Sequence, residues 1–467
     1  MEADLSSPGG ARYRSLSLWW DGLPGEVAVR PPLPGSLDVD VAVAGGGFTG
    51  LWTALYLADA DPDLRIAVLE RDVCGFGASG RNGGWCSALF AASDRRIARD
   101  HGPAAASAMR SAMQESVDEV GRMAAAEGIG CSFAKGGTVR LARTPAQLAR
   151  TLDEVDEARA DGVGEDDLVL LSAAEARERV GATGVLGGSF TPHCAALDPA
   201  RLVRGLATAV ERRGVAIYEQ TAVRAVRTRH VETDRGTVRA GIVVRATEGY
   251  TPSLAGEART LVPVYSLMIA TEPLPASFFD EVGLARRETF ADHRHLIIYG
   301  QRTADDRIAF GGRGAPYHFG SAVDPAFEDE PGVHAALART LVELFPALEG
   351  AAVTHRWGGP LGVPRDWFSS VGLDRSTGLA WAGGYVGDGV STTNLAARTL
   401  RDLILDRPSE LTTLPWVGHR SPRWEPEPLR YAGINAGLLL SERADRAEER
   451  SGHPTWHARA LGRLVGG

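Results

Sequence analysis

The chain has 467 residues, of which 44% are hydrophobic and 23% charged, and its formal net charge is −9. These values are ordinary for a globular protein of two domains or one elaborate domain, and the negative charge argues against a nucleic-acid partner. No apolar run approaches the roughly 18 residues of a membrane span, and the first residues lack a secretory signal. We therefore expect a cytoplasmic protein without a membrane partner.

The cysteines provide no framework for a metal or for disulfides. The four of them are Cys74, Cys86, Cys131 and Cys194, and no two form a C-x-x-C pair. The sequence therefore predicts no zinc or iron–sulfur site and no disulfide scaffold.

Residues 1–37 are rich in Pro, Gly and Trp and are predicted to be a lead-in that packs on the body of the protein. A short apolar strand, 41–44, then runs into Gly45-Gly46-Gly47-Phe48-Thr49-Gly50. Gly45, Gly47 and Gly50 match the G-x-G-x-x-G fingerprint. Its first glycine makes a tight turn, the second lets backbone approach a pyrophosphate, and the third lets the helix pack on the strand.

Glu70 directly follows the second apolar run, 66–69, and lies 20 residues after Gly50. An acid at about this distance from the glycine fingerprint accepts a hydrogen bond from a ribose hydroxyl. A carboxylate there would repel the extra phosphate of NADP, which leaves FAD or NAD. The alternative is an ordinary turn between a strand and a helix. The strand–turn–helix context and the spacing of the acid favour the nucleotide.

Further elements are predicted in chain order from periodicity and capping residues. Helices are expected at 95–126, 145–160, 199–212 with Asp198 as N-cap, 333–345, 392–405 and 427–450. Strands are expected at 138–141, 215–218, 221–223, within 231–244, and at 265–271, 296–299, 307–310 and 379–382.

Two glycine-rich segments have the composition of cofactor loops. In 75–85 the small side chains of Gly77, Ala78 and Ser79 let backbone run beside a cofactor, Arg81 and Asn82 supply donors, and Gly83 and Gly84 suit a flat ring. A flexible surface loop is the alternative, but Trp85 indicates anchoring. The segment 384–391 is a strand-to-helix turn whose N–H groups can stabilise negative charge.

Four separated motifs, 45–50 with Glu70, 75–84, 246–250 and 384–390, resemble those of the D-amino acid oxidase superfamily. This group of FAD-dependent amine oxidases includes glycine oxidase and sarcosine oxidase, and the chain looks most similar to its γ-glutamylputrescine oxidase branch. A softer match covers 299–312, and the resemblance spans about residues 39–406.

The resemblance implies a mixed α/β fold in which a Rossmann-like, glutathione-reductase-like FAD-binding domain carries an inserted β-rich substrate domain. The FAD-binding domain would comprise 38–92, 196–255 and 352–407, and the substrate domain 93–195 and 256–351. Residues 408–467 would form a helical tail on the outside.

It also implies the residues that contact FAD, with backbone groups at Val223 holding the adenine. These residues are Gly45, Gly47, Phe48, Thr49, Gly50, Glu70, Arg71, Gly77, Ala78, Ser79, Arg81, Asn82, Gly83, Gly84, Val223, Ala246, Thr247, Gly384, Gly387, Asp388, Gly389, Val390 and Ser391. Two positions depart from the family pattern: Glu248 replaces a small or amide residue, and Asp388 replaces a common histidine.

The expected reaction is oxidation of the C–N bond of an amine or amino acid, with hydride transfer to flavin N5, hydrolysis of the imine and reoxidation by O2 to H2O2. An aromatic wall would favour the neutral amine by desolvation, and Tyr265 and Tyr299 are candidates for it, with core packing as the alternative. Arg313 would clamp a carboxylate or form a surface salt bridge. Asp388 would lie beside the flavin ring, meet the substrate's amine, or only begin a helix.

Two absences limit this expectation. The chain has no cysteine after Cys194, so FAD should be bound non-covalently, and Lys135, its only lysine, precedes the region where some relatives use lysine to activate oxygen. An amine dehydrogenase with another acceptor therefore stays open. So do an N-hydroxylating FAD monooxygenase, a non-catalytic FAD-binding subunit and an NAD-dependent dehydrogenase. The oligomeric state is not predicted.

Overall fold

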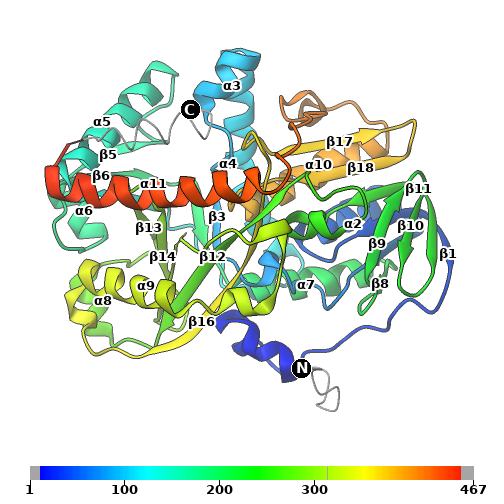
Figure 1. Ribbon diagram of the computed structural model, residues 1–467, viewed down its shortest axis with the longest axis horizontal. Coiled ribbons are helices and arrows are strands. Elements are labelled where there is room, and N and C mark those ends of the chain that lie inside the picture. The colour runs from blue at the N-terminus through cyan, green and yellow to red at the C-terminus, as the bar shows by residue number, and fades with distance from the viewer. Residues whose placement is uncertain (1–10, 313, 454–467) are drawn as a thin grey trace.

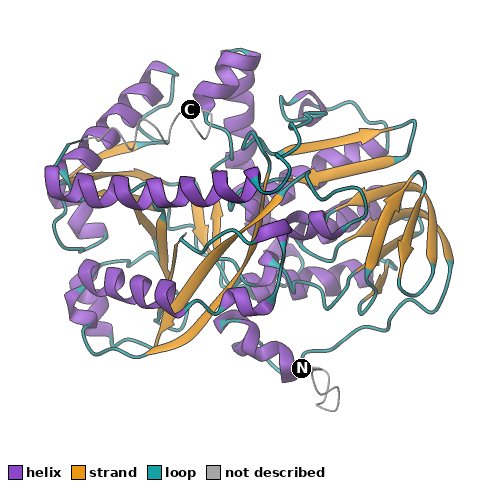
Figure 2. Ribbon diagram, in the orientation of Figure 1, coloured by secondary structure: helices purple, strands orange, loops and turns teal. Residues whose placement is uncertain are grey.

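The computed structural model describes residues 11–312 and 314–453. Its fold is mixed α/β, with a largely parallel sheet at one end and a largely antiparallel sheet at the other (Figures 1 and 2). This architecture is the fold class that the sequence predicts.

The first sheet has the strand order β17-β18-β11-β1-β2-β8, with a β9–β10 hairpin added beside β11. Its four central pairings, from β18 to β8, are parallel, as in a nucleotide-binding sheet. The strands are β1 (Leu37–Ala44), β2 (Ile66–Leu69), β8 (Ala216–Tyr218), β9 (Val223–Arg227), β10 (His230–Thr233), β11 (Thr237–Arg245), β17 (Ser370–Asp374) and β18 (Leu379–Gly383).

The helices that pack against this sheet include α2 (Phe48–Ala60), α7 (Pro199–Arg212) and α10 (Gly389–Ile404). Outside them, α4 (Pro103–Ala126) packs on α10, and α3 (Asp94–His101) packs on α4. Helix α2 follows β1 directly and is buried from Phe48 to Ala58, which explains why its sequence is apolar on all sides. Helix α7 starts as predicted, because Asp198 accepts a hydrogen bond from the N–H of Arg201 at 3.0 Å and Pro199 occupies the first turn.

The second sheet has the order β16-β12-β15-β14-β13-β4-β6-β5 and is antiparallel apart from β13–β4. Its strands are β4 (Thr138–Ala142), β5 (Val169–Ser172), β6 (Gly187–Thr191), β12 (Val262–Thr271), β13 (Thr289–Asp292), β14 (Ile298–Arg302), β15 (Ile308–Gly312) and β16 (Val353–Val363). Helices α5 (Pro145–Ala160), α6 (Ala173–Arg179), α8 (Ala276–Val282) and α9 (Pro331–Leu344) accompany it. A separate two-stranded sheet pairs β3 (Trp85–Ser87) with β7 (Cys194–Ala196). Strand β3 begins directly after the glycine-rich segment 75–84.

Strand β16 lies in the second sheet, whereas the predicted boundary at residue 352 places it in the FAD-binding domain. β16 pairs with β12 along its whole length, so it belongs to the second sheet, although 352–407 was assigned to the FAD-binding domain. The reason is the composition Trp-Gly-Gly-Pro-Leu-Gly, which gives no strand signal but suits an edge strand. The domain limits stay a prediction.

The first and last described segments flank this frame (Figure 1). The first described residues form a 3-10 helix, Ala11–Leu16, and the short helix α1 (Leu18–Asp21). The last described helix, α11 (Leu429–Ser451), runs across the surface in front of the second sheet (Figure 1). Residues 454–467 of the predicted helical tail lie outside the described residues.

Candidate functional site

A cavity, which we call the main cavity, lies where the carboxyl ends of the central strands of the first sheet meet the second sheet, and the space in it, including its opening to solvent, is about 1130 Å³. This edge of a parallel sheet is where α/β proteins bind nucleotides. Many residues predicted to contact FAD line the cavity, namely Gly45, Gly47, Phe48, Thr49, Glu70, Arg71, Gly77, Ala78, Ser79, Asn82, Val223, Ala246, Thr247, Gly387, Gly389 and Val390.

The N-terminus of α2 opens into this cavity. Its N-cap, Gly47, has no side chain with which to cap the helix, and Ser79 Oγ accepts a hydrogen bond from the N–H of Phe48 at 2.9 Å. A Cβ on Gly45 would lie 2.4 Å from the carbonyl oxygen of Ala246, and one on Gly50 would lie 2.0 Å from that of Gly45. Only glycine fits at these two positions. The start of the helix lines the cavity at Gly47, Phe48 and Thr49, so its dipole is directed at the cavity, with Ser79 Oγ on the N–H of Phe48.

Glu70 stands beside this turn. Its carboxylate accepts the N–H of Gly46 at 2.8 Å and that of Asp72 at 2.9 Å. Burial raises the pKa of Glu70 to about 7, against the lowering effect of these two donors. The side chain is therefore fixed at the cavity wall, with an acceptor for a ribose hydroxyl.

A second helix N-terminus, that of α10, opens into the same cavity. Asp388 is its N-cap but accepts no hydrogen bond there from a backbone N–H of the helix. Its Oδ1 instead accepts a hydrogen bond from Ser87 Oγ at 3.4 Å. Across the cavity, Thr49 Oγ1 and the Tyr385 hydroxyl lie 3.0 Å apart and join the starts of the two helices.

Glu248 explains how the turn before α10 is held. Its carboxylate is half-buried and accepts the N–H groups of Gly384 at 2.9 Å and Tyr385 at 3.2 Å. Cβ atoms on Gly362 or Gly383 would approach this carboxylate to about 3 Å, so both glycines make room for it. Burial raises the pKa of Glu248 to about 7 despite these donors. The larger residue that departs from the family pattern thus braces the cavity wall.

Several predicted cofactor residues lie behind the wall and do not line the cavity: Gly50, Arg81, Gly83, Gly84, Gly384, Asp388 and Ser391. Arg81 turns away, because it pairs with Glu328 at 2.5 Å and donates to the Tyr250 hydroxyl at 3.1 Å. Ser391 Oγ donates to the carbonyl of Ser87. A direct contact of these residues with a cofactor stays a prediction.

Other lining residues are not among the predicted cofactor contacts: Leu69, Gly75, Phe76, Glu248, Gly249, Tyr250, Ser253, Leu254, Pro360, Leu361, Tyr385 and Thr393. Most lie inside or next to the glycine-rich motifs, so neighbourhood in the sequence was the available signal. Pro360 and Leu361 come from β16, and no local pattern connects that strand with the cavity.

Tyr265 and Tyr299, the aromatic candidates for the substrate wall, lie in the second sheet and do not line the cavity. The Tyr265 hydroxyl accepts the N–H of Asp324 at 3.2 Å, and its ring contacts His318 and Phe327. The Tyr299 hydroxyl lies 2.8 Å from Ser266 Oγ, and its ring covers Gly83, where a Cβ would approach to 2.5 Å. Arg313 lies outside the described residues.

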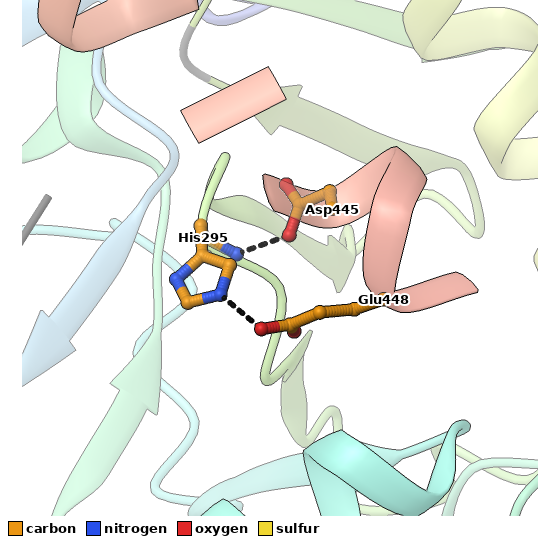
Figure 3. A group of neighbouring side chains, drawn as sticks. All are labelled: His295, Asp445 and Glu448. Atoms are coloured by element: carbon orange, nitrogen blue, oxygen red, sulfur yellow. Dashed lines mark hydrogen bonds and ion pairs between the residues drawn. The ribbon is translucent and has the colours of Figure 1, made fainter. Parts of the chain in front are cut away.

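One group of described residues has metal-ligand chemistry, His295, Asp445 and Glu448, at the contact of α11 with the second sheet (Figure 3). Both oxygens of Asp445 accept backbone N–H groups, from His295 and Leu296, and Glu448 pairs with Arg150 at 2.7 Å as well as with His295. A guanidinium inside the group supplies the positive charge, so we read it as a structural network that fastens α11. Within the described chain, no helix is long and apolar enough to cross a membrane.

Comparison with known proteins identifies the family to which the chain belongs. A family model described as "FAD dependent oxidoreductase" (DAO) matches residues 40–403. The chain belongs to the DAO family of FAD-dependent oxidoreductases. Gamma-glutamylputrescine oxidoreductase of Escherichia coli is 31% identical to this DAO-family chain, over 83% of the chain and 90% of the relative.

Other relatives agree with this membership. A probable oxidoreductase, OrdL, of Haemophilus influenzae is 29% identical over 80% of the chain and 85% of its own length. Among solved structures, glycine oxidase from Geobacillus kaustophilus superposes with a TM-score of 0.68 at 21% identity, covering 82% of this chain and 99% of that one. L-proline dehydrogenase from P. horikoshii gives 0.67 at 20% identity, covering 81% and 96%. These two similarities support the fold.

Proposed function

We propose that this DAO-family protein binds FAD non-covalently in the main cavity and oxidises the C–N bond of an amine or amino acid. The observation that carries the binding mode is the pair of helix N-termini, of α2 and α10, that open into one cavity beside Glu70. One suits a pyrophosphate, and the other suits a ring system that gains negative charge on reduction. All four cysteines are buried and none lines the cavity, which supports non-covalent binding.

FAD, when bound, supplies a hydride acceptor for the carbon next to the amine nitrogen. The protein's part is to bind, orient and desolvate the amine. Tyr299, on β14, lies over the glycine-rich segment at Gly83, and Tyr265 lies on β12 of the same sheet, with β15 between the two strands. We propose that this aromatic side of the site lowers the pKa of the bound ammonium by desolvation and so favours the neutral amine, which can lose hydride.

We propose O2 as the electron acceptor. Lys135 is paired with Asp118 and does not line the cavity, so an arginine or histidine would have to supply positive charge for the oxygen reaction. Oxidases and dehydrogenases both occur among the structural relatives, and an amine dehydrogenase with a different acceptor is therefore the second candidate.

Anaerobic mixing of the yellow holoprotein with a panel of amines tests the proposal. The panel contains γ-glutamylputrescine, putrescine, glycine, sarcosine and D-amino acids, and the visible flavin band is followed. Bleaching by one class establishes amine oxidation and names the substrate. Rapid recolouring in air with release of peroxide identifies an oxidase, and slow recolouring identifies a dehydrogenase.

The other outcomes contradict the proposal in separate ways. Bleaching by NAD(P)H alone would indicate the N-hydroxylating monooxygenase, and no bleaching by any donor would indicate a non-catalytic FAD-binding subunit. An apoprotein that FAD cannot reconstitute would rule out flavin binding itself. Flavin that stays with the protein pellet after acid precipitation would rule out non-covalent attachment.

A further inference from the structure

The glycine-rich segment 75–84 is held in place by side chains from other parts of the chain, which donate hydrogen bonds to its backbone carbonyl groups. Trp357 Nε1 donates to the carbonyl of Arg81 at 2.8 Å, Trp19 Nε1 to that of Asn82 at 2.8 Å, and Gln301 Nε2 to that of Gly83 at 2.6 Å. Three consecutive carbonyls thus each have a side-chain donor. The next carbonyl, of Gly84, accepts the backbone N–H of Leu197 at 2.8 Å.

The three donors come from three different parts of the molecule. Trp19 belongs to α1, Gln301 to β14 and Trp357 to β16. All three side chains are buried, at 5%, 0% and 2% exposure respectively. The two indole rings also touch edge to face, with centroids 6.3 Å apart. A buried carbonyl without a partner is costly, so these donors fix where the segment can lie.

This segment needs such external support because of its composition. Half of the residues in 75–84 are glycine, which loses more backbone freedom on ordering than any other residue. Asn82, at the centre, lines the cavity, and its own side chain already ties the segment together by accepting the N–H of Gly84 and donating to the carbonyls of Ala78 and Ser79. If the segment is ordered before a ligand arrives, the ligand does not bear that entropic cost.

We propose that Trp19, Gln301 and Trp357 act together as a carbonyl clamp that preorganises the cofactor segment 81–83, so that the region before residue 40 is part of the FAD site. The family model begins at residue 40, and Trp19 therefore lies outside it. The inference about FAD rests on the proposed function, whereas the ordering of the segment can be tested without any cofactor.

Trp20 provides a matched control for Trp19. It is the next residue in the same helix, it is fully buried, and it packs against the same segment at Gly80, but its indole N–H has no hydrogen-bond partner among the described residues. Trp19→Phe removes a donor from the clamp, and Trp20→Phe removes an indole N–H that donates to nothing. Gln301→Met is a second clamp variant that removes the donor and keeps a long side chain.

Two measurements are made on each variant and on the wild type. The first is hydrogen–deuterium exchange of a peptide covering 80–85 in the apoprotein, and the second is the FAD dissociation constant by flavin fluorescence. We expect Trp19→Phe and Gln301→Met each to speed exchange in this peptide and to weaken FAD binding by about fivefold to tenfold. Trp20→Phe should change both by less than about twofold.

The clamp is refuted if Trp19→Phe and Trp20→Phe change exchange and affinity equally. It is also refuted if the clamp variants lower only the melting temperature and leave the affinity for FAD unchanged. A wild-type protein that does not bind FAD would overturn the proposed function alone, because the exchange experiment would still show whether the clamp orders the segment. Should Trp19→Phe fail to fold, Gln301→Met decides.

Discussion

Glu248 places a carboxyl group inside the protein where its charged form is poorly solvated. Burial raises its pKa from 4.5 to about 7, although the N–H groups of Gly384, Tyr385 and Gly362 lower it. A carboxyl whose pKa is higher in the folded protein contributes stability that is full below its unfolded pKa and is lost as the pH rises through the folded value. For Glu248 this window runs from about pH 4.5 to about pH 7.

The stability of the Glu248→Gln variant relative to the wild type should therefore increase as the pH rises. Glutamine stays neutral, whereas the wild type loses stability as Glu248 ionises. Between pH 4.5 and pH 8, the unfolding free energy of the variant minus that of the wild type should therefore increase by up to about 3 kcal/mol. Chemical denaturation of both proteins at four pH values measures this. Glu165→Gln, at an exposed position, is the control and should run parallel to the wild type. A constant difference for Glu248→Gln would contradict the raised pKa.

Helix α2 shows how an element depends on the absence of a single methyl group. A Cβ on Gly50 would lie 2.0 Å from the carbonyl oxygen of Gly45, which is backbone against backbone and cannot be relieved by a side-chain rotation. Gly50→Ala should push α2 away from β1. We expect it to lower the melting temperature and to weaken FAD binding by about tenfold to a hundredfold.

The control for this prediction is another helical glycine that nothing constrains. Gly433, inside α11, has nothing within 4 Å of its Cβ position, so Gly433→Ala should stabilise the protein by about 0.5–1 kcal/mol and leave FAD affinity unchanged. Thermal denaturation and flavin fluorescence give both quantities. Wild-type affinity in Gly50→Ala would mean that the close approach of α2 is not needed for the site.

Helices and strands can be predicted from the sequence where the signal comes from residues within or next to the element. The helices 145–160 and 199–212 could be placed to the residue because Pro145, Pro199 and Asp198 mark their starts. Strand β16 could not be assigned, since its glycines and proline hide a strand whose partner, β12, lies about 90 residues earlier. The hydrogen bond from Trp19 to Asn82 and the bracing by Glu248 also join distant segments, and no spacing predicts either.

For the molecule as a whole, Glu219 anchors the N-terminal region to the first sheet. Its fully buried carboxylate pairs with Arg204 at 2.9 Å and Arg30 at 3.1 Å, and accepts the N–H groups of Arg30 and Cys74. Burial by itself would raise the pKa of Glu219, but these cations and donors outweigh it and the pKa is lowered.

Glu219→Gln would leave the half-buried guanidinium of Arg204 without its counter-charge and would leave Arg30 paired with Glu211 alone. We expect it to cost about 3–5 kcal/mol of stability at neutral pH, measured by chemical denaturation. Because the pKa of Glu219 is lowered on folding, its contribution is present above the unfolded pKa and is lost as the pH falls through the folded value. The deficit of the variant should therefore shrink in acid, and a deficit independent of pH would contradict the ionised state.

The order in which the cavity wall appears along the chain has a consequence for biosynthesis. Its lining residues begin at Gly45 and end at Thr393, with Tyr385, Gly387, Gly389 and Val390 among the last. A ribosome delivers the nucleotide-binding turn early, but the opposing helix N-terminus of α10 only after most of the chain has been made. If flavin binds as proposed, its uptake follows the synthesis of α10, so chains that end before Thr393 should remain colourless.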